Sequence, residues 1–136
     1  MLRLSGLLLL FCGSVLAQNI LFVVSDDQRP DTLHSLGNEV IETPNLDRLV
    51  ASGTAFTRAY AGYPICHVSR AQMLTGTHAF KALPKYPAGA IDPRLATLAG
   101  TFQKAGWHTC YAGKWHNDGH PAERGYTTTS ALFSSG

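Results

Sequence analysis

The sequence predicts an α/β fold in which helices flank a parallel sheet. Short apolar runs rich in branched residues alternate with helical patterns, and acidic, thiol and basic residues collect where these elements end. In open α/β sheets, ligands bind beyond the carboxyl ends of the strands. With 136 residues, of which 45% are hydrophobic and 15% charged, the chain has the composition of one soluble domain or part of one.

Three segments have the patterns of strands. Residues 19–25, NILFVVS, form a continuous apolar run, which is typical of a strand buried on both faces of a parallel sheet. Residues 53–61, GTAFTRAYA, alternate in a way that favours a second strand, and residues 107–113, WHTCYAG, favour a third.

Helices are predicted at three places. The clearest is TPNLDRLVASG, where Thr43 is suited to the N-cap, Pro44 to the first helical position and Gly53 to the end. The other expected elements are a helix that begins at or near Cys66 and closes at Gly76, a proline-rich loop over residues 81–93 and a helix over residues 95–106.

The first 17 residues have a different character from the rest. Arg3 gives a positive start, residues 7–11 are an apolar run, and Ala17 is a small residue suited to cleavage before Gln18. This pattern predicts a secretory signal peptide and therefore export to the periplasm or the extracellular space. The alternative, a membrane anchor, is disfavoured because the apolar run is shorter than the roughly 20 residues that span a bilayer.

The charge pattern argues against a nucleic-acid partner. The net charge is +2, and the 11 Lys and Arg residues are scattered among 9 acidic residues instead of forming a basic run. The sequence therefore predicts no nucleic-acid interface.

Two adjacent aspartates, Asp26 and Asp27, directly follow the first predicted strand. Neighbouring carboxylates repel each other, and a hard cation such as Ca²⁺ or Mg²⁺ would relieve that repulsion. The alternative is that the pair forms a turn or caps a helix, for which aspartate has its own backbone preference.

Cys66 lies where the second predicted helix begins, four residues before Arg70. The free N–H groups and the positive end of the helix dipole make this place suitable for an anion, and Arg70 is close enough to bind the same anion. The spacing is shorter than a tyrosine-phosphatase loop requires. A zinc site is disfavoured because Cys66 and His67 are adjacent and Cys110 stands alone.

The thiol of Cys66 conflicts with the aspartate pair, because sulfur is a soft ligand and the cation that carboxylates prefer is hard. A disulfide between Cys66 and Cys110 is an open alternative in an exported chain. The residues alone leave this conflict without a solution.

Four motifs resemble the N-terminal region of the formylglycine-dependent sulfatases, within the alkaline-phosphatase superfamily: NILFVVSDDQRPD, ETPNLDRLVASGTAFTRAYA, CHVSRAQMLTG and AGKWH. The similarity covers nearly all of residues 19–126. The resemblance implies an alkaline-phosphatase-like parallel sheet flanked by helices, of which this chain would be the incomplete N-terminal part. The expected organisation is a signal peptide over residues 1–17 and a truncated sulfatase domain over residues 18–136.

Each functional role is carried over from the resemblance by position. Asp26 and Asp27 match metal ligands, and Cys66 matches the cysteine that a formylglycine-generating maturation enzyme oxidises to an aldehyde, which then serves as metal ligand and nucleophile. The remaining matches are basic residues: Arg70 steadies the hydrated aldehyde, Lys114 contacts the substrate sulfate and His116 hydrogen-bonds the formylglycine.

The resemblance implies hydrolysis of a sulfate ester, with a calcium ion as cofactor and magnesium as the alternative. One hydroxyl of the hydrated aldehyde attacks the sulfur and expels the alcohol, and the other then releases the sulfate and regenerates the aldehyde. Each of these residues also has a non-catalytic alternative. Lys114 would be a solvated charge on a loop, His116 a structural histidine, and Arg70 a member of a surface ion pair.

Two departures from the family pattern bear on these expectations. Val68 stands where the family usually has proline or alanine, which puts conversion of Cys66 in question because a β-branched residue is less suited to the first helical turn. The family's later metal ligands lie beyond Gly136, so we expect the chain alone to show no appreciable turnover.

Two alternative functions stay open. A phosphonate or phosphate monoester hydrolase of the same superfamily would use the same residues, and a non-catalytic remnant would keep the motif without the activity. The expected substrate is a sulfated small molecule or polysaccharide, and the sequence does not specify which.

Overall fold

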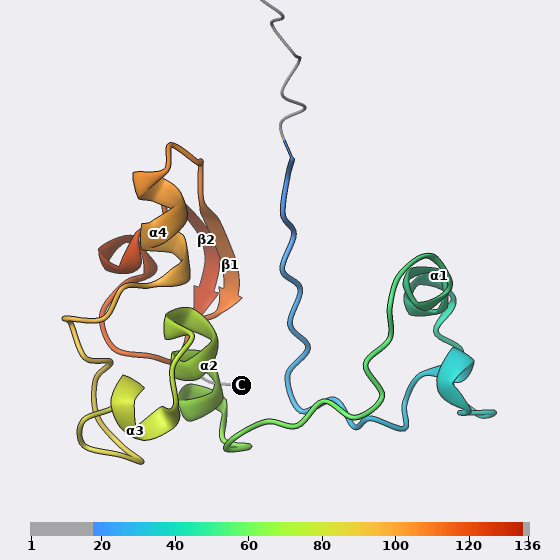
Figure 1. Ribbon diagram of the computed structural model, residues 1–136. Coiled ribbons are helices and arrows are strands. Elements are labelled where there is room, and N and C mark those ends of the chain that lie inside the picture. The colour runs from blue at the N-terminus through green and yellow to red at the C-terminus, as the bar shows by residue number, and fades with distance from the viewer. Residues whose placement is uncertain (1–17, 135–136) are drawn as a thin grey trace, which may run out of the picture.

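The computed structural model describes residues 18–134, so the predicted signal peptide over residues 1–17 lies outside the described residues (Figure 1). The helices and strands follow in chain order: η1 (His34–Leu36), α1 (Pro44–Ser52), α2 (Cys66–Thr75), α3 (Ala79–Ala82), α4 (Leu98–Lys104), β1 (Cys110–Lys114), η2 (Pro121–Arg124) and β2 (Thr128–Phe133), where η denotes a 3-10 helix. No helix in this described range is both long and apolar enough to cross a membrane.

The sheet contains β1 and β2, which pair in parallel. Cys110 pairs with Thr128, and the register shifts between Ala112 and Lys114, where Gly113 has a φ of 100°. The predicted parallel pairing is confirmed for these two strands. No strand was expected at β2, because TTSALF is not a continuous apolar run.

Two of the three predicted strands are wrong. Residues 19–25 and 53–61 form no strand and make no backbone hydrogen bond to other described residues. Leu21 is 88% exposed and Val23 78%, so the expected burial on both faces is absent in the described part of the chain. An apolar run favours an extended backbone locally, but a strand also needs a neighbouring strand, which the run itself cannot specify.

Helix α1 begins and ends where the sequence predicts, with Pro44 in its first turn and Gly53 after its last residue. Thr43 does not cap the helix through its side chain. Its hydroxyl instead accepts from His34 N at 2.9 Å and donates to Asp47 Oδ1 at 2.9 Å, which joins η1 to α1. These two elements lie apart from the others in Figure 1.

The core forms where α2 packs against α3 and the segments that follow. Helix α2 confirms the predicted helix, since it begins at Cys66 and ends before Gly76, which is left-handed at φ 63°. Val68 is fully buried, so the residue that departs from the family pattern has a packing role. The buried apolar residues of this cluster are Val68, Ala71, Leu74, Ala79, Ala82, Leu83, Ile91 and Trp115.

The predicted loop and third helix are confirmed in part. Helix α3 covers the beginning of the expected loop over residues 81–93, and α4 is shorter than the expected helix over residues 95–106. Helix α4 begins after Thr97, whose hydroxyl oxygen accepts from Gly100 N at 3.1 Å. The cap therefore fixes the start of the helix three residues later than the apolar pattern indicates.

Helix α4 and η2 meet through two glycines. Gly125 has a φ of 97°, and a Cβ there would lie 2.4 Å from the backbone N and Cα of Gly100. We expect Gly125→Ala to lower the free energy of unfolding by about 2–5 kcal/mol, because it adds a backbone clash to left-handed strain. Gly106→Ala is the matched control, since Gly106 has a φ of 85° but open space around it.

Urea denaturation of both variants tests this expectation. Gly106→Ala should lower the free energy of unfolding by only about 1–2 kcal/mol, because it adds left-handed strain without a clash. Equal losses in the two variants would contradict the close contact between α4 and η2.

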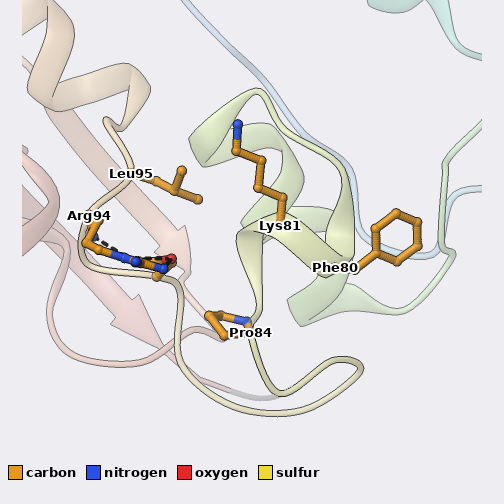
Figure 2. A pocket seen from close by; sticks show the side chains of 6 residues that line it. Phe80, Lys81, Pro84, Arg94 and Leu95 are labelled. Carbon is orange, nitrogen blue, oxygen red and sulfur yellow. Dashed lines mark hydrogen bonds and ion pairs between the residues drawn. The ribbon is translucent and has the colours of Figure 1, made fainter.

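A cavity of about 410 Å³ lies beside α3 and contains an ion pair between Asp92 and Arg94 (Figure 2). Asp92 is buried and accepts from the side chain and the backbone N of Arg94, which lowers the pKa of its carboxyl to about 2. None of the predicted site residues borders this cavity, whose lining residues are Phe80, Lys81, Pro84, Asp92, Arg94 and Leu95.

The depressed pKa of Asp92 predicts a pH dependence of stability. A carboxyl whose pKa is lower in the folded than in the unfolded chain stabilises the fold above pH 3.8, and this contribution is lost as the pH falls from 3.8 towards about 2. Arg94→Gln should therefore be less stable than the wild type at pH 7, and the difference should shrink across that window. A difference in melting temperature that stays constant from pH 7 to pH 2 would contradict this role of Arg94.

Candidate active site

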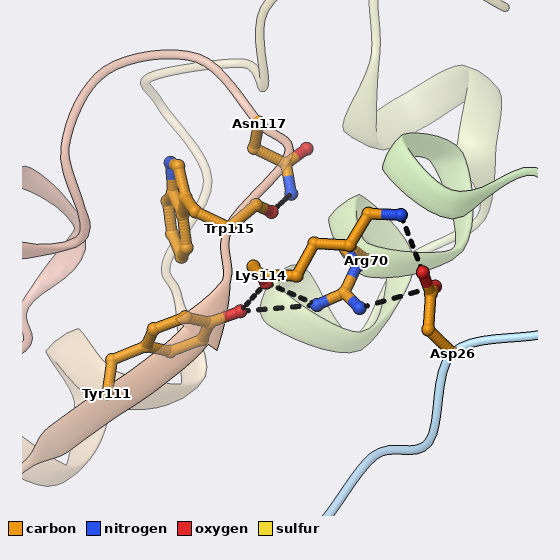
Figure 3. Close-up of polar contacts among 6 residues, drawn as sticks. All are labelled: Asp26, Arg70, Tyr111, Lys114, Trp115 and Asn117. Atoms are coloured by element: carbon orange, nitrogen blue, oxygen red, sulfur yellow. Dashed lines mark hydrogen bonds and ion pairs between the residues drawn. The ribbon is translucent and has the colours of Figure 1, made fainter. Parts of the chain in front are cut away.

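The candidate active site lies where the segment after residue 18 meets α2 and the end of β1. Asp26 Oδ2 accepts from Lys114 Nζ at 2.6 Å, and its Oδ1 lies 3.5 Å from Arg70 Nη2 (Figure 3). The side chains of Lys114 and Arg70 are only 8% and 11% exposed, while that of Asp26 is 40% exposed. Three residues that are far apart in the sequence thus form one charged cluster.

The backbone of Lys114 is held by the same cluster. Its carbonyl oxygen accepts from Arg70 Nη1 at 2.5 Å and from the Tyr111 hydroxyl, and Arg70 Nη1 also contacts that hydroxyl at 3.3 Å. Trp115, which follows Lys114, is 5% exposed and packs edge-on against Tyr111 with ring centroids 5.1 Å apart. The end of β1 is therefore fixed both by packing and by the guanidinium of Arg70.

The charges of the cluster stabilise one another. The hydrogen bond from Lys114 is the main cause that lowers the pKa of Asp26, and Arg70 contributes in the same direction. The hydrogen bond to Asp26 is likewise the main cause that raises the pKa of Lys114, and Cys66 adds to it. Lys114 thus stays protonated beside both Asp26 and Cys66.

Cys66 is the first residue of α2 and is half-buried. Ile65 occupies the N-cap and provides no side-chain cap, so the first N–H groups of this ten-residue helix are free to face an anion. Cys66 and Cys110 are both free thiols, so the alternative disulfide between them is not formed.

His116 follows the end of β1 with a left-handed backbone, at a φ of 48°. Its Nδ1 is buried and has no hydrogen-bond partner among the described residues. Burial is the main cause that lowers the pKa of its imidazole, and the nearby charges of Lys114 and His67 lower it further. Both effects favour the neutral ring, and its Nδ1 is left without a partner among the described residues.

The two aspartates of the predicted metal pair have different surroundings. Asp26 joins the cluster, whereas Asp27, with a φ of 51°, is exposed and forms no ion pair within residues 18–134. The same described range holds no group of three or more His, Cys, Asp or Glu residues close enough to bind a metal ion. The structure thus brings together Asp26, Arg70 and Lys114 near Cys66, and leaves Asp27 outside.

A cavity of about 270 Å³ borders the cluster. It opens between the segment that contains Phe22 and Val24 and the strand β1, with Phe133 of β2 beside it. Tyr111 lines this cavity and was missed by sequence reasoning. Its sequence signal was its position three residues before Lys114. Because Tyr111 falls within a predicted strand, this position indicated only a structural residue.

A cavity bordered by two largely buried cations suits an oxyanion or its ester, although Cys66 is not among the residues that line it. Comparison with known proteins agrees with that class. Residues 18–134 match the family model described as Sulfatase, and the chain belongs to the sulfatase family.

Several curated relatives are similar to this chain. An uncharacterized sulfatase, YidJ, of Escherichia coli is 38% identical over 102 residues, which cover 75% of this chain and 20% of the relative. An arylsulfatase of Clostridium perfringens is 41% identical over 99 residues, 72% of this chain and 21% of the relative. An N-acetylgalactosamine-6-sulfatase of Rattus norvegicus is 34% identical over 140 residues, 90% of this chain and 27% of the relative. The chain spans about a fifth to a quarter of the length of these relatives.

The geometry around Arg70 predicts that lysine cannot replace it. Arg70→Lys keeps the charge but cannot reach the Lys114 carbonyl, the Tyr111 hydroxyl and Asp26 together, so we expect a loss of about 1–3 kcal/mol in the free energy of unfolding. Arg94→Lys is the matched control, because Arg94 also pairs with an aspartate but is 85% exposed. Urea denaturation at pH 7 measures both variants, and a loss in Arg70→Lys no larger than that in Arg94→Lys would contradict the joint role of the guanidinium.

Proposed function

We propose that this chain provides the nucleophile and the sulfate-binding cations of a sulfuric ester hydrolase, with Cys66 oxidised to formylglycine. The observation that carries the proposal is the convergence of Lys114 and Arg70 on Asp26 beside Cys66. Both cations are nearly buried, so an anion that reaches them gains more than it would at the surface. Sulfate esters carry a negative charge on a tetrahedral centre and suit such a site.

Each residue has a role that follows from its contacts. Lys114 Nζ binds the sulfate oxygens, and Arg70 holds the Lys114 backbone while it adds a second positive charge. A neutral His116 presents an unpartnered nitrogen, which can accept a proton from, or donate one to, a hydroxyl at position 66. Formylglycine at position 66 would supply a hydrated aldehyde, whose hydroxyl oxygen is the nucleophile.

The residues of the site match a calcium ion in ligand type but not in their arrangement here, because Asp26 is paired with Lys114 and Arg70 and Asp27 lies outside that cluster. The carboxylates of Asp26 and Asp27 are hard oxygen ligands, and a hydroxyl of formylglycine would replace the soft sulfur of Cys66. For these three residues to hold the ion, Asp27 would have to turn towards Asp26, and the ion would then supply positive charge next to the sulfate group. Calcium takes about six to eight oxygen ligands, so further ligands are needed besides these three. We therefore expect little turnover from residues 18–134 alone.

The substrate and the route of maturation follow from the same proposal. Names such as arylsulfatase and N-acetylgalactosamine-6-sulfatase among the relatives support a sulfated small molecule or a sulfated sugar polymer as the substrate. A formylglycine-generating enzyme would act on Cys66 before α2 packs, because Val68 is fully buried in the folded chain. The signal peptide would direct the protein to the periplasm or the extracellular space.

Mass spectrometry of a tryptic digest tests conversion of Cys66 directly. After expression with a formylglycine-generating enzyme, the peptide over residues 59–70 should lose about 18 Da, because the thiol is replaced by an aldehyde. The peptide over residues 105–114, which contains Cys110, is the internal control and should keep its thiol. An unchanged mass of the first peptide would favour the non-catalytic remnant.

The ester assay separates the two enzymatic alternatives. In a longer protein that contains this chain and the remaining metal ligands, with Cys66 converted, hydrolysis of 4-nitrophenyl sulfate should exceed that of 4-nitrophenyl phosphate, and Cys66→Ala should abolish it. A preference for the phosphate ester would support the phosphate monoester hydrolase instead.

A further inference from the structure

His67 follows Cys66 in the first turn of α2, and no role comes to it from the family resemblance. Its Nε2 lies 2.6 Å from the carbonyl oxygen of Pro87. A carbonyl oxygen can only accept, so this nitrogen carries the proton and donates it. The Nε2 of His67 is therefore fully used by the loop and is not available as a proton acceptor for a group at position 66.

The bond from His67 holds a loop that is otherwise bonded locally. Among the described residues, the backbone hydrogen bonds of residues 84–90 reach no further than Leu83, namely Tyr86 N to Leu83 O and Ala88 N to Lys85 O, both at 3.0 Å. Tyr86 adds an aromatic contact with Tyr63, with ring centroids 5.4 Å apart. The hydrogen bond at Pro87 thus ties this loop to the helix that begins with Cys66, and it fixes the orientation of the His67 ring.

The fixed ring of His67 lies next to the ring of His116, with centroids 5.9 Å apart and planes inclined by 56°. His116 needs such a neighbour, because its Nδ1 has no hydrogen-bond partner among the described residues to orient the ring. Its backbone is also left-handed, at a φ of 48°, which holds the residue in a conformation that few side chains adopt. The His67 ring is a neighbouring side chain that can orient the His116 ring on this side.

We propose that His67 is a positioning residue, whose ring is anchored to Pro87 and sets the orientation of the His116 ring, the residue to which the proposed function gives a role at position 66. This inference rests on the proposed function for its effect on catalysis, but the contact between the two rings does not. In this proposal His67 acts by orienting His116 and does not contact the substrate.

Two variants of His67 test its hydrogen bond to Pro87 and its ring contact with His116 separately. His67→Gln keeps an N–H donor for Pro87 and removes the ring, while His67→Phe keeps a ring and removes the donor. In the full protein with formylglycine formed, we expect each to lower kcat about tenfold and to leave KM within about twofold, because a misplaced His116 affects the reaction more than binding. The matched control is His108→Gln, since His108 is exposed and bonds only Thr128 on the sheet.

Nuclear magnetic resonance of the protein labelled with ¹³C-histidine provides a readout that does not need activity. We expect a cross-relaxation signal between the His67 and His116 rings, and a shift of the His116 Cε1 resonance in both His67 variants but not in His108→Gln. If the wild type cleaves no sulfate ester, the proposed function fails and the resonance of His116 alone decides this proposal.

The outcomes separate a positioning role from a structural one. A lower kcat together with a displaced His116 resonance, at an unchanged melting temperature, supports the proposal. A wild-type kcat in both His67 variants overturns it. A lower kcat with the His116 resonance in place also overturns it, because His67 would then act by another route.

Discussion

The pairing of one carboxylate with two nearly buried cations determines the architecture of this site. Asp26 draws Lys114 and Arg70 together from the end of β1 and from α2, and both cations would otherwise be buried without a counter-charge. The segment that carries Asp26 makes no backbone hydrogen bond over residues 19–25 to the rest of the described chain. These ion pairs are therefore its main polar attachment to the folded part.

The same arrangement is the basis of the proposed anion site. Two positive groups face a single carboxylate that is 40% exposed, so the local charge is positive and the carboxylate remains accessible. The N-terminus of α2 adds the positive end of its dipole beside Cys66. Arg70 contributes structure as well as charge, because its guanidinium also holds the Lys114 carbonyl, and a lysine has no equivalent fork of donors.

Local signals in the sequence predicted the elements that local interactions stabilise. Helices α1 and α2 begin and end close to the expected residues, because proline, glycine and apolar spacing act within each helix. Residues 19–25 and 53–61 were wrongly predicted as strands, because strand formation depends on a partner strand that a local pattern does not specify, and β2 was missed for the same reason.

The part of the candidate site that lies in recognisable sequence motifs could be predicted. The resemblance identified Arg70, Lys114 and Cys66, which the structure brings near Asp26, but the different surroundings of Asp26 and Asp27 depend on backbone geometry that adjacency in sequence does not encode. His67 carried no signal, because its hydrogen bond to Pro87 joins positions 20 residues apart.

A double-mutant cycle between Asp26 and Lys114 tests the central claim most directly. The free energy of unfolding would be measured for Asp26→Asn, Lys114→Met and the double variant, at pH 7 and with a chelator present. Direct pairing predicts that the double variant loses clearly less stability than the two single variants together. Strictly additive losses would contradict the account, because the two groups would then not interact in the folded protein.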